Sequence, residues 1–292
     1  MIGNAKFMEQ PGGFWALVRT LSEHLGYTNR TKKGEPKGSG ALKVHTVAEQ
    51  AAALKELNLD PELVMAKNGI ATELGLLLAD YFRYRADVLT SHVQPDLMDK
   101  DKAAEVFAKE HARLNPKCAI PMNKQKGEKQ EPAYLTGLIN MLVEEAIGDL
   151  PCNFNPLQLT TFTRDGTPLR TLARRVDGAF PSAVNPIAVW EVKEYYFTTT
   201  FGSRVADGVY ETLLDGLELQ ELHRATNVCA NHVLFVDAHF TWWVCGKSYL
   251  CRIVDMLHMG LVSEVVFGRE VLRRVPELAA SWAQTYRARN PN

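Results

Sequence analysis

The 292-residue sequence lacks several features that assign a protein to a class directly. It has no uninterrupted apolar run near the ~18 residues that indicate a membrane-spanning helix, and its first residues form no apolar signal core. It also contains no Walker loop, no Gly-x-Gly-x-x-Gly motif and no Ser-His-Asp set. The first two absences predict a soluble, cytoplasmic protein. The missing motifs give no support to P-loop, dinucleotide-binding or serine-hydrolase chemistry.

Cysteine and net charge are both low. The five cysteines form no Cys-x-x-Cys pair, and such an odd set favours reduced thiols inside the cell. The formal net charge is -1, so nothing global indicates nucleic acid and any basic surface has to be local. Cys229 and His232, with His239, Cys245 and Cys251, are zinc-ligand types, but their irregular spacing favours buried structural residues.

The composition is that of an ordinary globular protein, with 46% hydrophobic and 23% charged residues. We expect two parts. Residues 1–132 form a mostly helical region that serves DNA recognition or dimerisation, and residues 133–292 form a domain of helices and sheet.

The N-terminal region contains one segment with helix-turn-helix spacing. Thr46 and Glu49 predict a capping box at the start of a helix over 47–57. The dipeptide Asp60-Pro61 predicts that a helix starts again there. This spacing suits either DNA reading or ordinary helix packing.

Positive charge in the N-terminal region is concentrated in loops. A loop over 29–40, rich in Gly and containing Pro, either wraps a phosphate backbone or is simply solvated. Its basic residues are Arg30, Lys32, Lys33 and Lys37. The helix predicted over 71–92 contains the run Tyr81-Phe82-Arg83-Tyr84-Arg85, which suits base stacking or a core stripe with snorkelling arginines. A second basic stretch, over 117–129, is typical of a linker or flexible arm.

Residues 133–292 show the pattern of a sheet covered by helices. The Asp165-Gly166 pair predicts a hairpin, and alternation predicts strands on either side of it. The expected strands cover 157–162, 169–180, 187–196, 232–237 and 261–267, and the expected helices cover 133–147, 204–224, 249–259 and 269–288. This order predicts an α/β (α+β) fold with a mixed sheet.

Three residues on neighbouring predicted strands have the side chains of a metal-dependent site. Glu191 and Lys193 are two apart on one strand, so they point to the same face, and a hairpin brings Asp177 beside Glu191. Two carboxylates and an ammonium at a strand end suit a hard divalent cation that also binds a phosphate. The alternative is a surface strand with an incidental acid nearby.

This arrangement resembles the PD-(D/E)xK nuclease superfamily and, more narrowly, its type II restriction endonucleases. The resemblance covers about residues 134–266. It rests on an αβββαβ order with Asp177 on the second strand and Glu191-x-Lys193 on the third. Val176 stands where the family name implies proline, and no clear Gln-x-x-x-Tyr follows on the next helix.

The resemblance implies a Mg²⁺-dependent, sequence-specific endonuclease that hydrolyses phosphodiester bonds of double-stranded DNA. Asp177, Glu191 and the backbone carbonyl of Val192 are the implied ligands of one or two Mg²⁺ ions per active site. Lys193 is the implied residue that orients the attacking water or offsets transition-state charge. Glu145, on the helix before the strands, resembles the additional acid that many members have there; Glu144, next to it, is expected to face water.

DNA contacts are expected from a polar and cationic rim around these residues. The rim consists of Arg174, Arg175, Tyr195, Tyr196, Thr198 to Thr200, Ser203 and Arg204, and the alternative for these residues is solvated strand ends. DNA contacts are also expected from the loop residues Arg30, Lys32, Lys33 and Lys37. One helix face bears Asp207, Glu211, Asp215 and Glu218 and is expected to be solvated. The alternative is that Asp207 or Glu211 approaches the metal.

The implied partners are duplex DNA, a second copy of the chain and a cognate DNA methyltransferase acting on the same site. A homodimer is expected because a double-strand cut needs two active sites. Two alternatives remain open at this stage. One is a modification-dependent, repair or phage-defence nuclease on the same core, and the other is an inactive DNA-binding protein. The intact set of Asp177, Glu191 and Lys193 argues against inactivity.

Overall fold

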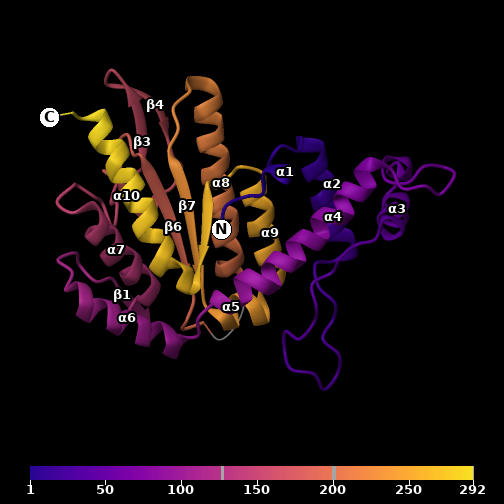
Figure 1. The fold of residues 1–292 in the computed structure, drawn as a ribbon, viewed down its shortest axis with the longest axis horizontal. Helices are drawn as coiled ribbons and strands as arrows, with labels where there is room; N and C mark the ends of the chain where they lie inside the picture. The colour runs from indigo at the N-terminus through magenta and orange to yellow at the C-terminus, as the bar shows by residue number, and fades with distance from the viewer. Residues whose placement is uncertain (126–127, 199–201, 292) are drawn as a thin grey trace. The chain divides into compact units, whose positions relative to one another are not determined.

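A computed structural model describes residues 1–125, 128–198 and 202–291, without the side chains of residues 124, 125, 128–130 and 204. The chain divides into two compact units (Figure 1). We call the one formed by residues 3–95 and 242–259 the helical unit. The other, formed by residues 1–2, 96–241 and 260–292, is the sheet unit.

The helical unit is built around a core of aromatic and aliphatic side chains, among them Leu21, Leu54, Leu78 and Phe82. Its main helices are α2 (Gly12–Leu25), α3 (Val47–Glu56), α4 (Glu73–Val88) and α9 (Lys247–His258), and a short helix α1 (Ala5–Met8) precedes them. The capping box at Thr46 is confirmed. After Asp60, however, only a single 3₁₀ turn forms, η1 (Pro61–Leu63), so the expected second helix does not follow α3 directly.

The aromatic and arginine run of α4 belongs to the core of the helical unit. Tyr81 and Phe82 are fully buried, and the buried Arg85 donates to both carboxylate oxygens of Asp255 at 3.0 Å. Asp255 also accepts from the Tyr81 hydroxyl at 2.6 Å. Of the two alternatives for this run, the core stripe is therefore the observed one, with Arg85 buried instead of reaching solvent.

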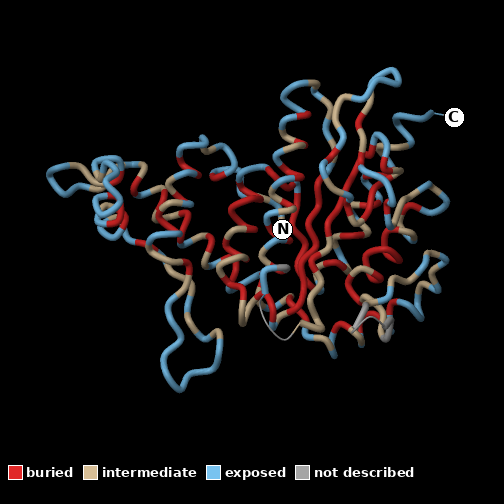
Figure 2. The backbone as a smooth tube through the Cα atoms, turned by 180° about the vertical axis from the view of Figure 1, so that it is seen from behind, coloured by how far each residue is buried: buried red, intermediate tan, exposed pale blue. Residues whose placement is uncertain are grey.

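The sheet unit has a mixed fold of helices and sheet, as expected. Its main sheet has four strands in the order β5 (Gly178–Phe180), β6 (Ala188–Glu194), β7 (Asn231–Asp237) and β8 (Glu264–Phe267). Strands β5 and β6 are antiparallel, whereas β6–β7 and β7–β8 are parallel. The inner strands are buried along nearly their whole length (Figure 2).

The two faces of the sheet are covered by different helices. The long helix α8 (Ser203–Thr226) connects β6 to β7 and packs on one face. The helices of the other face are α6 (Lys100–Leu114), α7 (Tyr134–Ile147) and α10 (Val271–Arg289), whose apolar residues share one core with the sheet. Both faces being covered explains why β7 and β8 are near-continuous apolar runs.

Alternation along β6 decides which side chains meet α8. Ala188 and Trp190 join the core shared with α7 and α10, where Trp190 stacks on Trp282 with ring centroids 5.6 Å apart. Glu191 and Lys193 therefore point to the opposite, α8 face. Gly178 on β5 permits this packing, because a Cβ at that position would lie 2.0 Å from the Trp190 ring.

The strand expected over 169–180 is two strands in different sheets. The hairpin at Asp165-Gly166 is confirmed, and both residues have the positive φ that such a tight turn requires. Its strands, β3 (Thr161–Arg164) and β4 (Thr167–Thr171), form a separate two-stranded sheet. The chain then leaves the ladder, so Asp177 lies in the connection just before β5.

The boundary between the two units lies near residue 95, whereas the pattern suggested residue 132. The reason is that α6 packs against α7 and contributes Val106 and Phe107 to the core of the sheet unit. The basic stretch expected as a linker contains two paired antiparallel strands, β1 (Met122–Gln125) and β2 (Glu128–Pro132).

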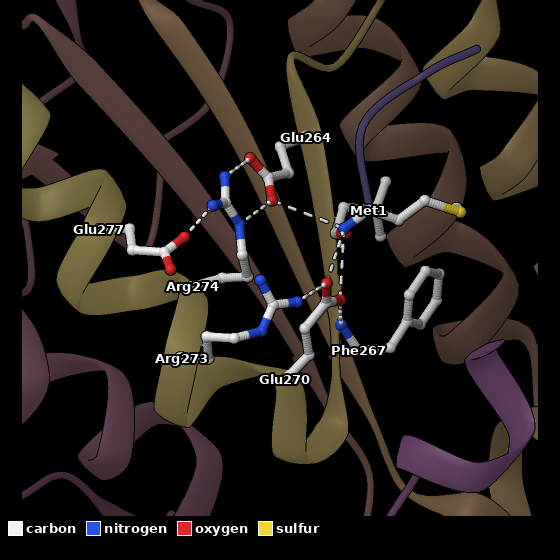
Figure 3. A network of polar contacts seen from close by, with 8 residues as sticks. Met1, Glu264, Phe267, Glu270, Arg273, Arg274 and Glu277 are labelled. Carbon is white, nitrogen blue, oxygen red and sulfur yellow. Dashed lines mark hydrogen bonds and ion pairs between the residues drawn. The ribbon is translucent and has the colours of Figure 1, made fainter.

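A polar network ties β8 to the helix that follows it (Figure 3). Arg274 of α10 donates to both carboxylate oxygens of Glu264 at 2.8 Å, and it also pairs with Glu277. The amino group of Met1 lies 3.5 Å from Glu264 and 3.2 Å from Glu270. Because Glu264 is nearly fully buried, these cations compensate a charge that would otherwise destabilise the edge of the sheet.

Candidate functional site: a carboxylate cluster under α8

Six charged side chains gather on the α8 face of the sheet, from three segments of the chain. We call them the carboxylate cluster: Arg174, Asp177, Glu191, Lys193, Glu211 and Asp215. The connection before β5 supplies the first two, β6 supplies the next two, and α8 supplies the last two.

Glu191 is the centre of the cluster. Its side chain is 0% exposed, with Oε1 lying 2.8 Å from Arg174 Nη1 and Oε2 lying 2.9 Å from Lys193 Nζ. Buried carboxylates are costly unless they are paired, and here one acid uses a cation at each oxygen. The Glu191 and Lys193 side chains do converge, as the two-residue spacing predicted.

Asp177 is attached to the same strand through the backbone. Its Oδ2 accepts a hydrogen bond from the Val192 amide at 2.7 Å, and its own amide donates to the Trp190 carbonyl at 3.1 Å. These two bonds fix the carboxylate beside Glu191 although Asp177 is not itself in a strand. Val192 thus contributes its N–H to the site, while its side chain packs in the core of the opposite face.

Helix α8 contributes two acids that differ in exposure. Asp215 is fully buried and accepts from Arg174 Nη1 at 2.6 Å, whereas the Glu211 side chain is 45% exposed. Glu211 Oε2 lies 3.2 Å from Lys193 Nζ and 3.4 Å from Arg174 Nη2. The Oδ1 atom of Asp215 is buried and has no hydrogen-bond partner.

Burial and the charge of Glu191 shift two acids of the cluster, Asp177 and Asp215, toward their neutral forms. Burial, followed by the charge of Glu191, raises the pKa of Asp177 to about 6 and the pKa of Asp215 to about 7. Burial alone would lower the pKa of Lys193, but Glu191 and Asp177 outweigh it and the pKa lies above its ordinary value. Lys193 is therefore an ammonium at neutral pH.

The chemistry of the cluster suits a hard divalent cation. Its four carboxylates face only two cationic side chains, so it has more potential negative charge than positive charge. Oxygen donors of this kind are the ligands that Mg²⁺ prefers. Within the described part of the chain, no three His, Cys, Asp or Glu side chains are already arranged as a metal site. A cation would have to displace an existing contact of Glu191.

Glu145, expected as the additional acid, is not part of the cluster. It lies on α7, which covers the opposite face of the sheet, and its exposed carboxylate pairs with Arg113 of α6 at 3.1 and 3.2 Å. The neighbouring Glu144 accepts from the Lys117 amide at 2.8 Å. The acids that do reach the site come from α8. Glu211 was the expected alternative there, whereas Asp215 was expected to be solvated.

The expected rim residues do not all lie around the cluster. Arg174 belongs to the interior of the cluster, and Tyr195 lies beside it, since its hydroxyl closely approaches Gly208 of α8. Tyr196 lies on the opposite face, where its hydroxyl donates to the buried Asp237.

Of the remaining rim residues, Thr198 is half-buried, and the others are exposed or lie outside the described part. Arg175 and Ser203 are exposed. The loop residues Arg30, Lys32, Lys33 and Lys37 are exposed in the helical unit. Thr199, Thr200 and the side chain of Arg204 fall outside the residues that the structure describes.

His232, which the sequence grouped with the Cys and His residues expected to be structural, also lies near the cluster. His232 of β7 is buried, its Nδ1 lies 2.9 Å from the Leu261 carbonyl, and its Nε2 has no hydrogen-bond partner. Burial lowers its pKa, and Glu191, Arg174 and Lys193 also act on it. The register of β6 and β7 pairs it with Val189, which points to the α8 face. Cys229, expected to be buried, is exposed.

The fold and the site together define a protein with a mixed α/β unit that holds a buried carboxylate cluster. The chain belongs to the family described as Domain of unknown function (DUF7687), which matches residues 98–282, most of the sheet unit. Residues 1–92 match a second domain of unknown function, DUF7690, so the two matches meet near the boundary between the two units. No curated protein and no solved structure matches the chain. No helix in the described residues has the length and apolar character needed to cross a membrane.

Proposed function

We propose that the protein is a Mg²⁺-dependent endonuclease that hydrolyses phosphodiester bonds of double-stranded DNA, with the carboxylate cluster as its active site. The observation that carries the proposal is the meeting of Asp177, Glu191 and Lys193 on one face of the sheet. Perturbed acids beside a fixed ammonium in one cluster are typical of catalytic sites. The resemblance to PD-(D/E)xK nucleases adds the reaction class.

Each residue of the trio has a distinct task in this reaction. Asp177 and Glu191 would hold the cation, with the Val192 carbonyl as a further ligand. A bound Mg²⁺ supplies Lewis-acid chemistry, which polarises the scissile phosphate and lowers the pKa of water. Lys193, held between Glu191 and Glu211, remains charged and donates hydrogen bonds to the phosphate as negative charge develops on it.

DNA would be positioned mainly by contacts to phosphates. Arg175 and Ser203 are exposed in the sheet unit, and the basic loop with Arg30, Lys32 and Lys33 is exposed in the helical unit. Such contacts give affinity without reading sequence. If the enzyme is a restriction endonuclease, it works as a homodimer and has a cognate methyltransferase as its partner.

A cleavage assay tests the proposal. The purified protein is incubated with supercoiled plasmid and with phage DNA, with and without methylation, in Mg²⁺ or in EDTA. We expect discrete fragments in Mg²⁺ and none in EDTA. Glu191→Gln and Lys193→Met should each lower cleavage by about a hundredfold or more, as removal of one group that stabilises a transition state does in other enzymes.

The product pattern separates the candidate functions. A smear with no discrete fragments indicates a non-specific nuclease on the same site. Cleavage of methylated DNA alone indicates a modification-dependent enzyme. If the wild-type protein binds duplex DNA but cuts neither substrate in Mg²⁺ or Mn²⁺, the nuclease proposal is wrong and a DNA-binding role replaces it.

A further inference from the structure

Arg174 occupies an unusual place for a residue expected to contact DNA. Its side chain is 24% exposed, and its guanidinium reaches three carboxylates, at 2.6 Å to Asp215, 2.8 Å to Glu191 and 3.4 Å to Glu211. The fork of the guanidinium suits such multiple pairing better than an ammonium does. Arg174 is therefore an internal residue of the cluster.

The two buried acids need this positive charge in the arrangement described. Glu191 and Asp215 are both 0% exposed, and Arg174 Nη1 lies within ion-pair distance of each of them. An uncompensated charge in such a place is strongly unfavourable. Arg174 thus neutralises the cluster from within.

A divalent cation at Glu191 would compete with this pairing. Both oxygens of Glu191 have a cation within ion-pair distance, Arg174 at Oε1 and Lys193 at Oε2, although Oε1 accepts no hydrogen bond. Lys193 is required beside the reacting phosphate in the proposed reaction, so Arg174 is the partner that has to give way. Glu211 is the exposed one of its three partners and can keep the guanidinium at the rim.

The unpartnered oxygen of Asp215 is a second, independent sign that the cluster takes up a further group. Asp215 uses Oδ2 for Arg174, while the buried Oδ1 has no hydrogen-bond partner. Buried polar atoms without a partner are rare and commonly mark a site that an ion or water completes. A cation near Glu191 would satisfy this oxygen directly or through water.

We propose that Arg174 is an internal counter-ion of the carboxylate cluster, which holds the position of a divalent cation at Glu191 until such a cation displaces it toward Glu211. This inference rests on the proposed function and names the residue that regulates metal occupancy of the same site. It follows that Arg174 weakens metal binding, since part of the binding free energy is used to break its contact with Glu191.

Metal binding without DNA tests the inference. Mn²⁺ is titrated into the full-length wild-type protein, Arg174→Gln and Arg170→Gln, and free Mn²⁺ is followed by electron paramagnetic resonance. Arg170 is the matched control, because it is 26% exposed and also pairs with α8 carboxylates, those of Glu218 and Glu221, but it does not contact Glu191.

Arg174→Gln should bind Mn²⁺ about tenfold more tightly or better, because the ion pair with Glu191 no longer competes with the metal. Arg170→Gln should stay within about twofold of the wild type, as expected for a surface pair. A second readout is thermal unfolding. The unfolding temperature of Arg174→Gln should be lower than that of the wild type in EDTA, and Mn²⁺ should raise it by more than it raises that of the wild type.

If Arg174→Gln folds poorly, Arg174→Lys keeps the charge without the fork and should show an intermediate gain in affinity. Unchanged or weaker Mn²⁺ binding by a folded Arg174 variant overturns the inference. If the wild type still cuts DNA in that case, the proposed function stands and only the role of Arg174 is wrong. If neither protein binds Mn²⁺ and the wild type cuts nothing, both proposals fall.

Discussion

The replacement Asp215→Asn should stabilise the metal-free protein at alkaline pH. Asp215 is fully buried, and burial together with Glu191 raises its pKa from 3.8 to about 7. At ~1.4 kcal/mol per pKa unit, this shift corresponds to about 4 kcal/mol against the ionised form in the folded state. Asn is neutral and nearly isosteric, and relaxation around the charge reduces such values, so we expect a gain of about 1–3 kcal/mol at pH 8.

The pH dependence of this gain follows from proton linkage. The folded-state pKa of Asp215 lies above its unfolded value, so between about pH 4 and pH 7 the folded protein binds more protons than the unfolded chain. The stability of the wild type therefore falls as pH rises through this window, and the cost of the ionised carboxylate is fully present above pH 7. The advantage of Asp215→Asn should be largest at pH 8 and should disappear near pH 4.

Urea unfolding in EDTA at several pH values measures this effect. Asp207→Asn is the matched control, since it makes the same chemical change at an exposed position of the same helix and should alter stability by no more than ~0.5 kcal/mol. If Asp215→Asn is less stable than the wild type at pH 8, the ion pair with Arg174 outweighs the cost of burial. The prediction that ionised Asp215 destabilises the metal-free protein would then be wrong.

Two further predictions concern the packing of β5 against β6 and the question of which acids belong to the site. Gly178→Ala should destabilise the protein by several kcal/mol, because the new Cβ would lie 2.0 Å from the Trp190 ring. Gly13→Ala is the control and should be nearly neutral, because its Cβ would meet nothing within 4 Å. The urea concentration at the midpoint of unfolding measures both effects. Glu211→Gln should lower DNA cleavage, because Glu211 holds Lys193, while Glu145→Gln should leave the cleavage rate unchanged. If instead Glu145→Gln lowers the cleavage rate and Glu211→Gln does not, Glu145 is part of the site and Glu211 is not.

The order of elements in the sheet unit was predictable because its signals are local. The hairpin at Asp165-Gly166 depends on the φ of two residues, and the alternation of β6 depends on neighbours along one strand. These signals also placed Glu191 beside Lys193. The break between β4 and β5 was not predictable, because it depends on which sheet each half of the apolar run joins.

The origin of the additional acids could not be read from helix patterns alone. A helical wheel places Glu145 on one side of its helix but does not say which face of the sheet that helix covers. Similarly, the spacing of Glu211 and Asp215 is typical of a solvated face, and only their tertiary contacts with Arg174 and Lys193 make them part of the cluster. A stripe of acids in a helix that follows a Glu-x-Lys strand is the signal that deserved more weight.

We propose above that the carboxylate cluster is a metal-dependent nuclease site. The most direct measurement is the rate of plasmid nicking and linearisation in Mg²⁺ by the wild type and by Glu191→Gln, at equal concentrations of folded protein. We expect saturable, Mg²⁺-dependent cleavage by the wild type and a cleavage rate lower by about a hundredfold or more in the variant. Equal rates for the two proteins, or no cleavage by the wild type, would contradict it.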